Sequence, residues 1–222
     1  MFALWSELTP LILVSAALPL QTVVTLALVR SSLRAAYAWV AGMVMVRMLQ
    51  GLLFGVVLAP GEADLNSEPR YFLGALLLVL SLLLYAKALR TAFGAEDEDA
   101  PPPEWLSKAG TMSPLAAFGA GAGFMTLSVK FLVFTLAAIS AITYAHIGTK
   151  LSLLTFLLFV LLAHTAPFGI LALATSSSAR STAILQALRS WLTSNSRIIT
   201  IIFAVIFGTW FLLKALTRLG VI

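Results

Sequence analysis

The residues of this sequence that could do chemistry lie inside long apolar runs, and they are cations and amides. They are Gln21, Arg47, Gln50, Lys130 and His164. A charge in such a run is costly when the run crosses a bilayer, so each cation should face the protein interior and find a partner there. No Asp or Glu lies in the same runs. A substrate-binding site built from these five residues therefore favours an anionic partner, such as a sulfate, phosphate or carboxylate group.

Two interpretations stay open for each of the ionisable residues in this set. Arg47 either contacts a ligand or pairs with helix-end carbonyls as a structural bolt. Lys130 either lines a binding site or extends its long side chain to the membrane interface. His164 either contacts a ligand or packs as a satisfied interior residue. The three together indicate a binding site more strongly than any one of them does alone.

The elements that carry these residues must be membrane-spanning helices. Hydrophobic residues make up 60% of the chain and charged residues only 10%, whereas a soluble domain carries about 25% charged residues. A helix needs about 20 apolar residues to cross the hydrocarbon of a bilayer. We predict an all-α polytopic membrane protein with six transmembrane helices, over residues 8–29, 35–59, 71–89, 114–143, 151–174 and 198–213.

The composition also excludes several classes of function. The chain has no cysteines, which rules out disulfides, thiolate catalysis and cysteine-ligated metals. The net charge of +5 does not indicate nucleic-acid binding, because most basic residues lie in short loops between apolar runs. No catalytic arrangement of Ser, His and Asp is evident, and two histidines without a membrane carboxylate make a poor metal site. We therefore predict no enzymatic activity, no metal and no other cofactor.

Basic residues in the loops predict the orientation of the chain. The loops on one side carry Arg30, Arg34, Lys87, Arg90, Lys108, Arg180, Arg189 and Arg197. The other side carries fewer, namely Arg70, Lys150, Lys214 and Arg218. The positive-inside rule places the more basic side in the cytoplasm. We expect a multi-pass protein of the bacterial cytoplasmic membrane with both termini outside the cytoplasm.

The chain divides into two halves of three helices each. Residues 1–92 form the first half and residues 114–222 the second. Leu18-Pro19-Leu20-Gln21 aligns with Leu127-Ser128-Val129-Lys130, and the stretch 50–55 aligns with 164–169. Because each half has an odd number of spans, the halves insert in opposite directions. The pattern predicts two inverted three-helix repeats, an arrangement common in secondary transporters.

Two further segments stand outside the six spans. The cytoplasmic linker over 93–113 contains an acidic run at 96–99 and three prolines at 101–103. It is either a solvated connection or a docking element for a partner. Residues near 180–196 alternate polar and apolar side chains at helical spacing, which predicts an amphipathic helix in the membrane interface.

Several residues are candidates for breaking or bending a span and so for gating. They are Pro19, Gly119, Gly121, Gly123 and Pro167. Proline removes a backbone donor and clashes with the preceding turn, whereas glycine lowers the cost of an irregular backbone. The Gly-x-x-x-Gly spacings at 51/55 and 119/123 also predict close helix contacts, within one chain or in a homodimer.

The arrangement resembles the LysE transporter superfamily, and within it the GAP or Sap-like proteins. The likeness is carried by four stretches, Leu18-Pro19-Leu20-Gln21, Arg34 through Gly42, Leu127 to Phe131, and His164 to Gly169. It implies a role in moving glycolipids such as glycopeptidolipid and sulfolipid towards the cell surface. Superfamily members often show Asn-Pro-Lys where this chain has Ser128-Val129-Lys130, so only the lysine is retained.

Two hypotheses follow for function. The first is a membrane transporter or exporter of an anionic or amphipathic substrate, such as a lipid or glycolipid, with a site near the membrane midplane between the two halves. The second is a non-transporting accessory subunit of a lipid-export machine, with the linker and the segment near 180–196 as its binding surfaces. Both place the protein among membrane lipids, and the second adds a protein partner.

Overall fold

The computed structural model describes residues 2–17, 19–57, 68–94, 111–176 and 178–221, and these ranges contain helices but no strand. Three helices are long and apolar enough to cross a membrane, or six if each of three bent helix pairs counts as one span. An all-helical protein with several candidate membrane spans is therefore confirmed. The inverted repeat stays a prediction. The acidic run and the prolines of the linker lie outside the described residues.

The first half contains one bent helix pair and two long helices. Helices α1 (Phe2–Ala17) and α2 (Pro19–Ser31) meet at a bend of 47°. Pro19 begins α2, a position where its missing N–H removes no helical hydrogen bond. Helices α3 (Leu33–Val57) and α4 (Glu68–Ala92) are each continuous.

The second half begins with two bent pairs. Helix α6 (Pro114–Leu127) starts after Ser113, whose Oγ accepts a hydrogen bond from the Ala116 N–H at 3.2 Å. It meets α7 (Val129–Tyr144) at a bend of 68°, with Ser128 between them.

Helices α8 (Thr149–Ala163) and α9 (Thr165–Thr175) meet at a bend of 60° around His164. Pro167 lies in the first turn of α9. It cannot donate to the carbonyl four residues before it, and its ring crowds that carbonyl, so a straight helix through this point is unfavourable.

The glycines of the fourth span do not mark its bend, which corrects one of our expectations. Gly119, Gly121 and Gly123 lie inside the continuous helix α6, and the bend follows at Ser128. Gly121 instead allows close packing, because a Cβ there would lie 2.2 Å from the Trp39 carbonyl oxygen of α3. A Cβ at Gly119 or Gly123 would meet open space. The contact between α3 and α6 thus uses Gly121 and not the predicted pair.

Other glycines refine the same picture of helix contacts. A Cβ at Gly42 of α3 would lie 2.3 Å from the Phe118 carbonyl oxygen of α6, so this glycine joins Gly121 in the contact. A Cβ at Gly51 would overlap the ring of Phe156 in α8, at 1.9 Å. At Gly55 nothing lies within 4 Å. Only one glycine of the predicted 51/55 pair therefore faces a neighbour.

Helix α10 (Ala179–Leu219) is the longest element and ends at Gly220, whose φ of 76° is left-handed. It joins the predicted amphipathic segment and the predicted sixth span into one helix, of which Arg197–Leu219 is apolar enough to cross a membrane. Whether its first part lies in the membrane interface stays a prediction.

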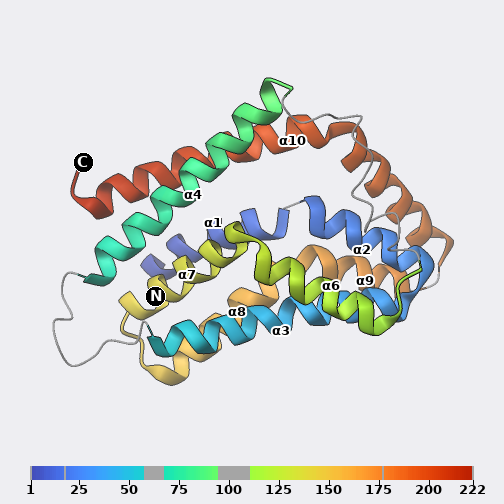
Figure 1. Ribbon diagram of the computed structural model, residues 1–222, viewed down its shortest axis with the longest axis horizontal. Helices are drawn as coiled ribbons and strands as arrows, with labels where there is room; N and C mark the ends of the chain where they lie inside the picture. The colour runs from blue at the N-terminus through green and yellow to red at the C-terminus, as the bar shows by residue number, and fades with distance from the viewer. Residues whose placement is uncertain (1, 18, 58–67, 95–110, 177, 222) are drawn as a thin grey trace.

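Helices α4 and α10 run side by side in opposite directions (Figure 1). Polar contacts join them along their length. The Ser81 hydroxyl donates to the Gly208 carbonyl at 2.9 Å, and the hydroxyls of Tyr85 and Thr209 lie 2.7 Å apart. The Arg197 Nη2 donates to the Ala92 carbonyl at 3.2 Å, at the end of α4. We call this unit the α4–α10 pair.

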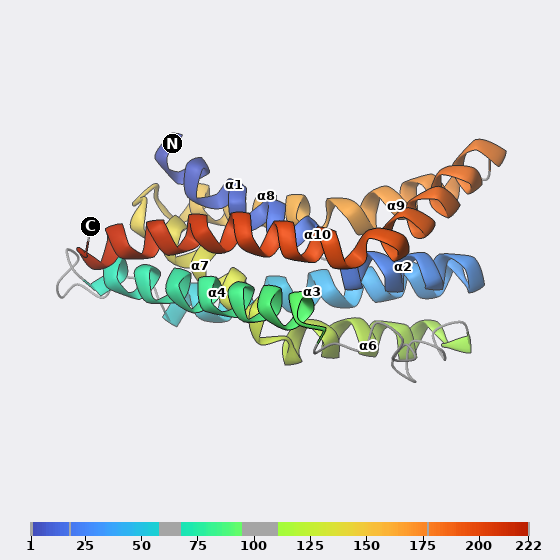
Figure 2. The same cartoon turned by 90° about the horizontal axis from the view of Figure 1, so that it is seen from above.

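The α4–α10 pair lies along one side of the bundle formed by the other helices, and both termini lie at the same end (Figure 1). Figure 2 shows the pair from above, extending along the bundle. A series of aromatic contacts connects this pair to the bundle. The series passes from Trp39 of α3 through Phe124, Phe131 and Phe134 to Phe211 of α10.

Candidate functional site

A cavity of about 640 Å³ lies between the α4–α10 pair and the bends of the bundle. It reaches the last turn of α1, the first turn of α2 and the junction of α6 with α7. Most of its lining is apolar. The apolar residues are Val14, Leu20, Leu80, Leu83, Leu84, Ala86, Phe124, Phe131, Phe134, Ile199, Phe203 and Ala204, and the neutral polar ones are Ser128 and Thr200.

Three cations complete the lining of this cavity. Lys87 and Arg90 come from the last turns of α4, and Lys130 comes from the first turn of α7. Among the described residues that line the cavity, none is acidic. The start of α7 adds the positive end of its helix dipole near Lys130. An apolar cavity with this charge suits a ligand that is anionic at one end and apolar at the other.

The sequence interpretation placed only one of these cations in a site. Lys130 was predicted there, whereas Lys87 and Arg90 were interpreted as orientation signals. Helical spacing could have revealed them, because Leu80, Leu84 and Lys87 follow one another on a single face of α4. A helix face whose apolar residues are followed by cations predicts contact with a ligand that has an apolar part and an anionic part.

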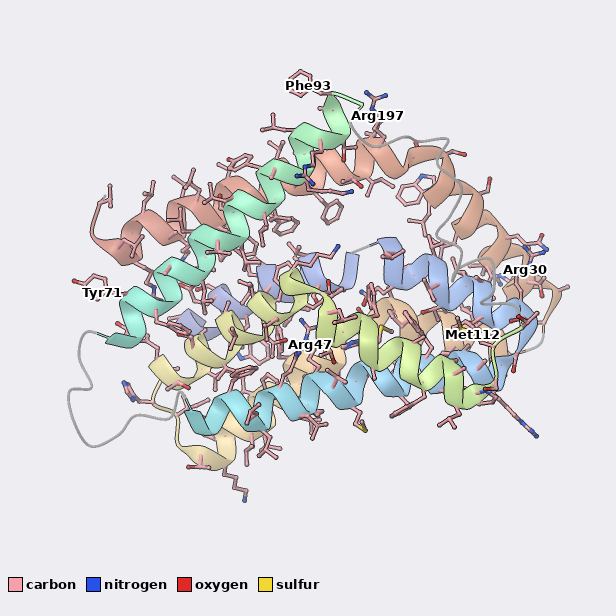
Figure 3. All side chains as sticks on the ribbon, in the orientation of Figure 1. Arg30, Arg47, Tyr71, Phe93, Met112 and Arg197 are labelled. Atoms are coloured by element: carbon pink, nitrogen blue, oxygen red, sulfur yellow. The ribbon has the colours of Figure 1, made fainter. Side chains whose placement is uncertain are left out.

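Arg47 lies in a second polar cluster, which does not line the cavity. Figure 3 shows it about midway between Tyr71 at one end of the molecule and Arg30 at the other. The side chain is 0% exposed. Its Nη1 donates to the Ser15 Oγ at 2.8 Å and its Nε to the Thr135 Oγ1 at 3.2 Å.

Two aromatic rings complete the surroundings of this arginine. The guanidinium carbon lies 5.0 Å from the ring centroid of Phe159 and 5.7 Å from that of Phe131. These are cation–π distances. Within the described part of the chain no carboxylate pairs with Arg47, so every contact that stabilises its charge is neutral.

The remaining predicted site residues lie near Arg47 and leave polar atoms unsatisfied. Gln21 donates from Nε2 to the Ser15 carbonyl at 2.6 Å, which joins it to the same cluster. His164 Nδ1 lies 2.8 Å from the Val160 carbonyl and therefore carries the proton, because a carbonyl only accepts. His164 directly follows α8, the helix whose Phe159 ring contacts Arg47. Gln50 lies on α3, three residues after Arg47.

Four buried atoms of these residues have no hydrogen-bond partner. They are Arg47 Nη2, Gln21 Oε1, Gln50 Oε1 and His164 Nε2. The first is a donor, the two amide oxygens are acceptors, and the histidine nitrogen is an acceptor in the tautomer given above. Buried polar atoms are usually satisfied, so each of these four is a point where water or a ligand group would bind.

A third charged group lies at the end of the molecule that carries both termini. The Glu7 Oε1 pairs with Lys214 Nζ at 3.2 Å and with Arg218 Nη2 at 3.1 Å. Tyr144 lies under Arg218, with 4.6 Å from the guanidinium carbon to the ring centroid. This group joins α1 to α10 and contains the one described acid found buried in the molecule.

Comparison with known proteins identifies a family for the chain. A protein-family model described as Sap, sulfolipid-1-addressing protein, matches residues 2–217. No curated protein and no solved structure matches the chain. The match covers all the helices that form the cavity and the Arg47 cluster. It does not extend to the LysE superfamily, so that resemblance stays a prediction.

Proposed function

Because the chain belongs to the Sap, sulfolipid-1-addressing protein family, we propose that it moves an anionic, amphipathic lipid across the membrane without changing it chemically. The head group would bind in the cavity between the α4–α10 pair and the helix bends. The observation that carries this proposal is the lining of that cavity, which is apolar apart from three cations and two hydroxyls.

The cations suit a sulfate, phosphate or carboxylate group. Lys87, Arg90 and Lys130 all supply charged donors, and the guanidinium of Arg90 can form two parallel hydrogen bonds to an oxyanion. A volume of about 640 Å³ lies within the usual range for sites that hold small ligands or head groups. The cavity can therefore hold a charged head group and part of a chain.

The apolar lining suits the hydrocarbon part of the same ligand. Leu83 and Phe203 line the cavity and are 40% and 37% exposed, so the cavity is not closed at these side chains. We infer that this opening faces the lipid. A lipid could thus place its head group beside Lys130 while its chains stay in the bilayer.

The broken helices support an inverted-repeat transporter. The two stretches aligned in the sequence, 18–21 and 127–130, fall at the bends between α1 and α2 and between α6 and α7. Helix α3 packs on α6, and α8 packs on α1, as a two-fold relation between the halves would require. The relation is incomplete, because α8 and α9 are broken where α3 is continuous.

Reconstitution of the purified chain alone tests the proposal. We expect it to speed the movement of a fluorescent sulfated glycolipid between the leaflets of vesicles, and to act less on the same lipid without the sulfate. Lys130→Gln should weaken binding of the sulfated lipid by about tenfold or more, because a charge-assisted contact is worth about 1.5–3 kcal/mol. Lys87→Gln and Arg90→Gln should act in the same direction.

The matched control is Lys150→Gln, which removes an exposed cation from the first turn of α8. It should leave binding unchanged. Equal effects of Lys130→Gln and Lys150→Gln would remove the cavity as the site. A purified chain that binds the lipid without moving it, and that co-purifies with another membrane protein, would favour the accessory role.

A further inference from the structure

We propose that Arg47 forms a second anion-binding station, separated from the cavity by the ring of Phe131, which acts as a gate. The inference rests on the proposed function, because it describes where an anionic head group goes after it leaves Lys130. It adds Phe131 as a barrier between the two sites, and it assigns a role to the buried charge of Arg47, which does not line the cavity.

The first step of the argument is the charge of Arg47. The side chain is 0% exposed, yet its contacts are two hydroxyls and two ring faces. None of these carries a negative charge, and the Nη2 atom has no partner. A buried cation held in this way has one strong donor left for an anion.

The second step is the set of acceptors in the same cluster. Gln21 Oε1 and His164 Nε2 are buried and have no partner. An anionic group alone would not satisfy them, because both accept hydrogen bonds. Water, or a head group with hydroxyls beside its anionic group, would satisfy both kinds of atom. The station therefore fits an anionic head group that carries hydroxyls better than an anionic group without them.

The third step is the position of Phe131. Its ring is fully buried, lines the cavity and receives the guanidinium of Arg47 at 5.7 Å. The ammonium of Lys130 lies 5.9 Å from the centroid of the same ring. The Phe131 ring thus lies close both to Lys130, one of the three cavity cations, and to Arg47.

The local backbone explains how such a gate could move. Phe131 lies three residues after Ser128, where α6 and α7 meet at 68°. A change in that bend would shift Lys130 and Phe131 together, because both lie in the first turn of α7. An anion that replaced the ring face at Arg47 would stabilise the shifted position.

The chain has no cysteines, which allows a direct test of access to Arg47. Thr135→Cys places a single thiol beside the guanidinium, since Thr135 Oγ1 accepts from Arg47 Nε. The full-length protein in lipid nanodiscs is treated with two methanethiosulfonate reagents of similar size, one a sulfonate and one a quaternary ammonium. The rate at which each reagent modifies the thiol is measured by mass spectrometry. It is then divided by the rate for the same reagent on the denatured protein.

We expect slow modification at position 135 with Phe131 present. Phe131→Ala should raise the sulfonate rate by about tenfold or more and raise the cation rate less, because a fixed positive charge concentrates anions locally. Arg47→Gln should abolish the preference for the sulfonate, and Arg47→Lys should retain part of it. Ala137→Cys is the control, because it is buried on a different face of α7.

Several outcomes would overturn the proposal. Rates at position 135 that do not change with Phe131→Ala would show that the ring is no barrier. Equal rates for the two reagents in the Phe131→Ala protein would remove Arg47 as an anion station, without any need for an Arg47 variant. Lipid binding that still depends on Lys130 in that case would leave the proposed function intact.

Discussion

At the scale of single residues, Arg47 is the least expected feature of this protein. A membrane chain with few charges buries one arginine completely, among hydroxyls and aromatic rings. Cation–π contacts offset part of the desolvation cost, at about 0.5–2 kcal/mol each. A leucine or methionine would fill the same space without the cost of removing a charge from water. We therefore infer that the charge of Arg47 serves function.

Replacement of the arginine by an apolar side chain tests that view. We expect Arg47→Met to leave thermal stability in detergent unchanged or higher, because apolar residues that replace buried charges are often neutral or stabilising. Lipid movement in vesicles should fall. A large drop in melting temperature would instead identify Arg47 as a structural bolt, the alternative that the sequence left open. Arg47→Lys is the control that keeps the charge.

At the scale of helices, the bends and the glycines have separate roles. The bend at Ser128 lies next to Lys130 of the cavity lining, and the bend at His164 follows α8, whose Phe159 contacts Arg47. The glycines at 42 and 121 bring α3 against α6, with backbone atoms so close that a side chain has no room. The α3–α6 contact in turn holds Trp39 against Phe124 of the cavity lining.

Substitution of these glycines should separate the two roles. Gly121→Ala should destabilise the protein by about 1–3 kcal/mol, because the new Cβ would meet a backbone carbonyl that cannot move aside cheaply. Gly119→Ala and Gly123→Ala should be neutral or stabilising, since both sites face open space and alanine is the better helix former. Thermal unfolding of the three variants in the same detergent provides the comparison. A stable Gly121→Ala protein would contradict the close contact.

At the scale of the whole molecule, the cations of the cavity, of the Arg47 cluster and of the Glu7 ion pairs lie in different places. The cavity contains Lys87, Arg90 and Lys130, Arg47 lies near the middle, and Lys214 and Arg218 lie at the end with both termini (Figures 1 and 3). At that end Glu7 supplies the counter-charge from α1. The ion pairs therefore connect the first helix of the chain to the last.

Removal of the Glu7 charge should loosen that connection. Glu7→Gln is expected to cost about 1–3 kcal/mol of stability, since it weakens two charge-assisted hydrogen bonds of a carboxylate that is only 10% exposed. Thermal unfolding and proteolysis near the N-terminus would both report it. Lys150→Gln, at an exposed position, should change neither. Equal stability of the wild type and Glu7→Gln would show that the ion pairs do not hold α1 to α10.

The sequence by itself determined the class of this protein and most of its helices. Apolar runs long enough to cross a bilayer leave few alternatives, because only helices of that composition satisfy their backbone within lipid. The same reasoning identified Arg47, Lys130 and His164, because a charge or imidazole inside an apolar run is conspicuous. The family match over residues 2–217 agrees with the Sap-like resemblance that four stretches of the sequence carried.

Only the tertiary structure decided which of these residues lie together. Periodicity assigns a face to each side chain but does not say which face meets which, and that depends on bend angles and on close approaches between helices. The bend lies at Ser128 and not at the glycines, and Gly121 instead allows the close approach to Trp39. As a result Lys130 faces the cavity with Lys87 and Arg90, whereas Arg47 lies on the other side of Phe131 with Gln21 and His164.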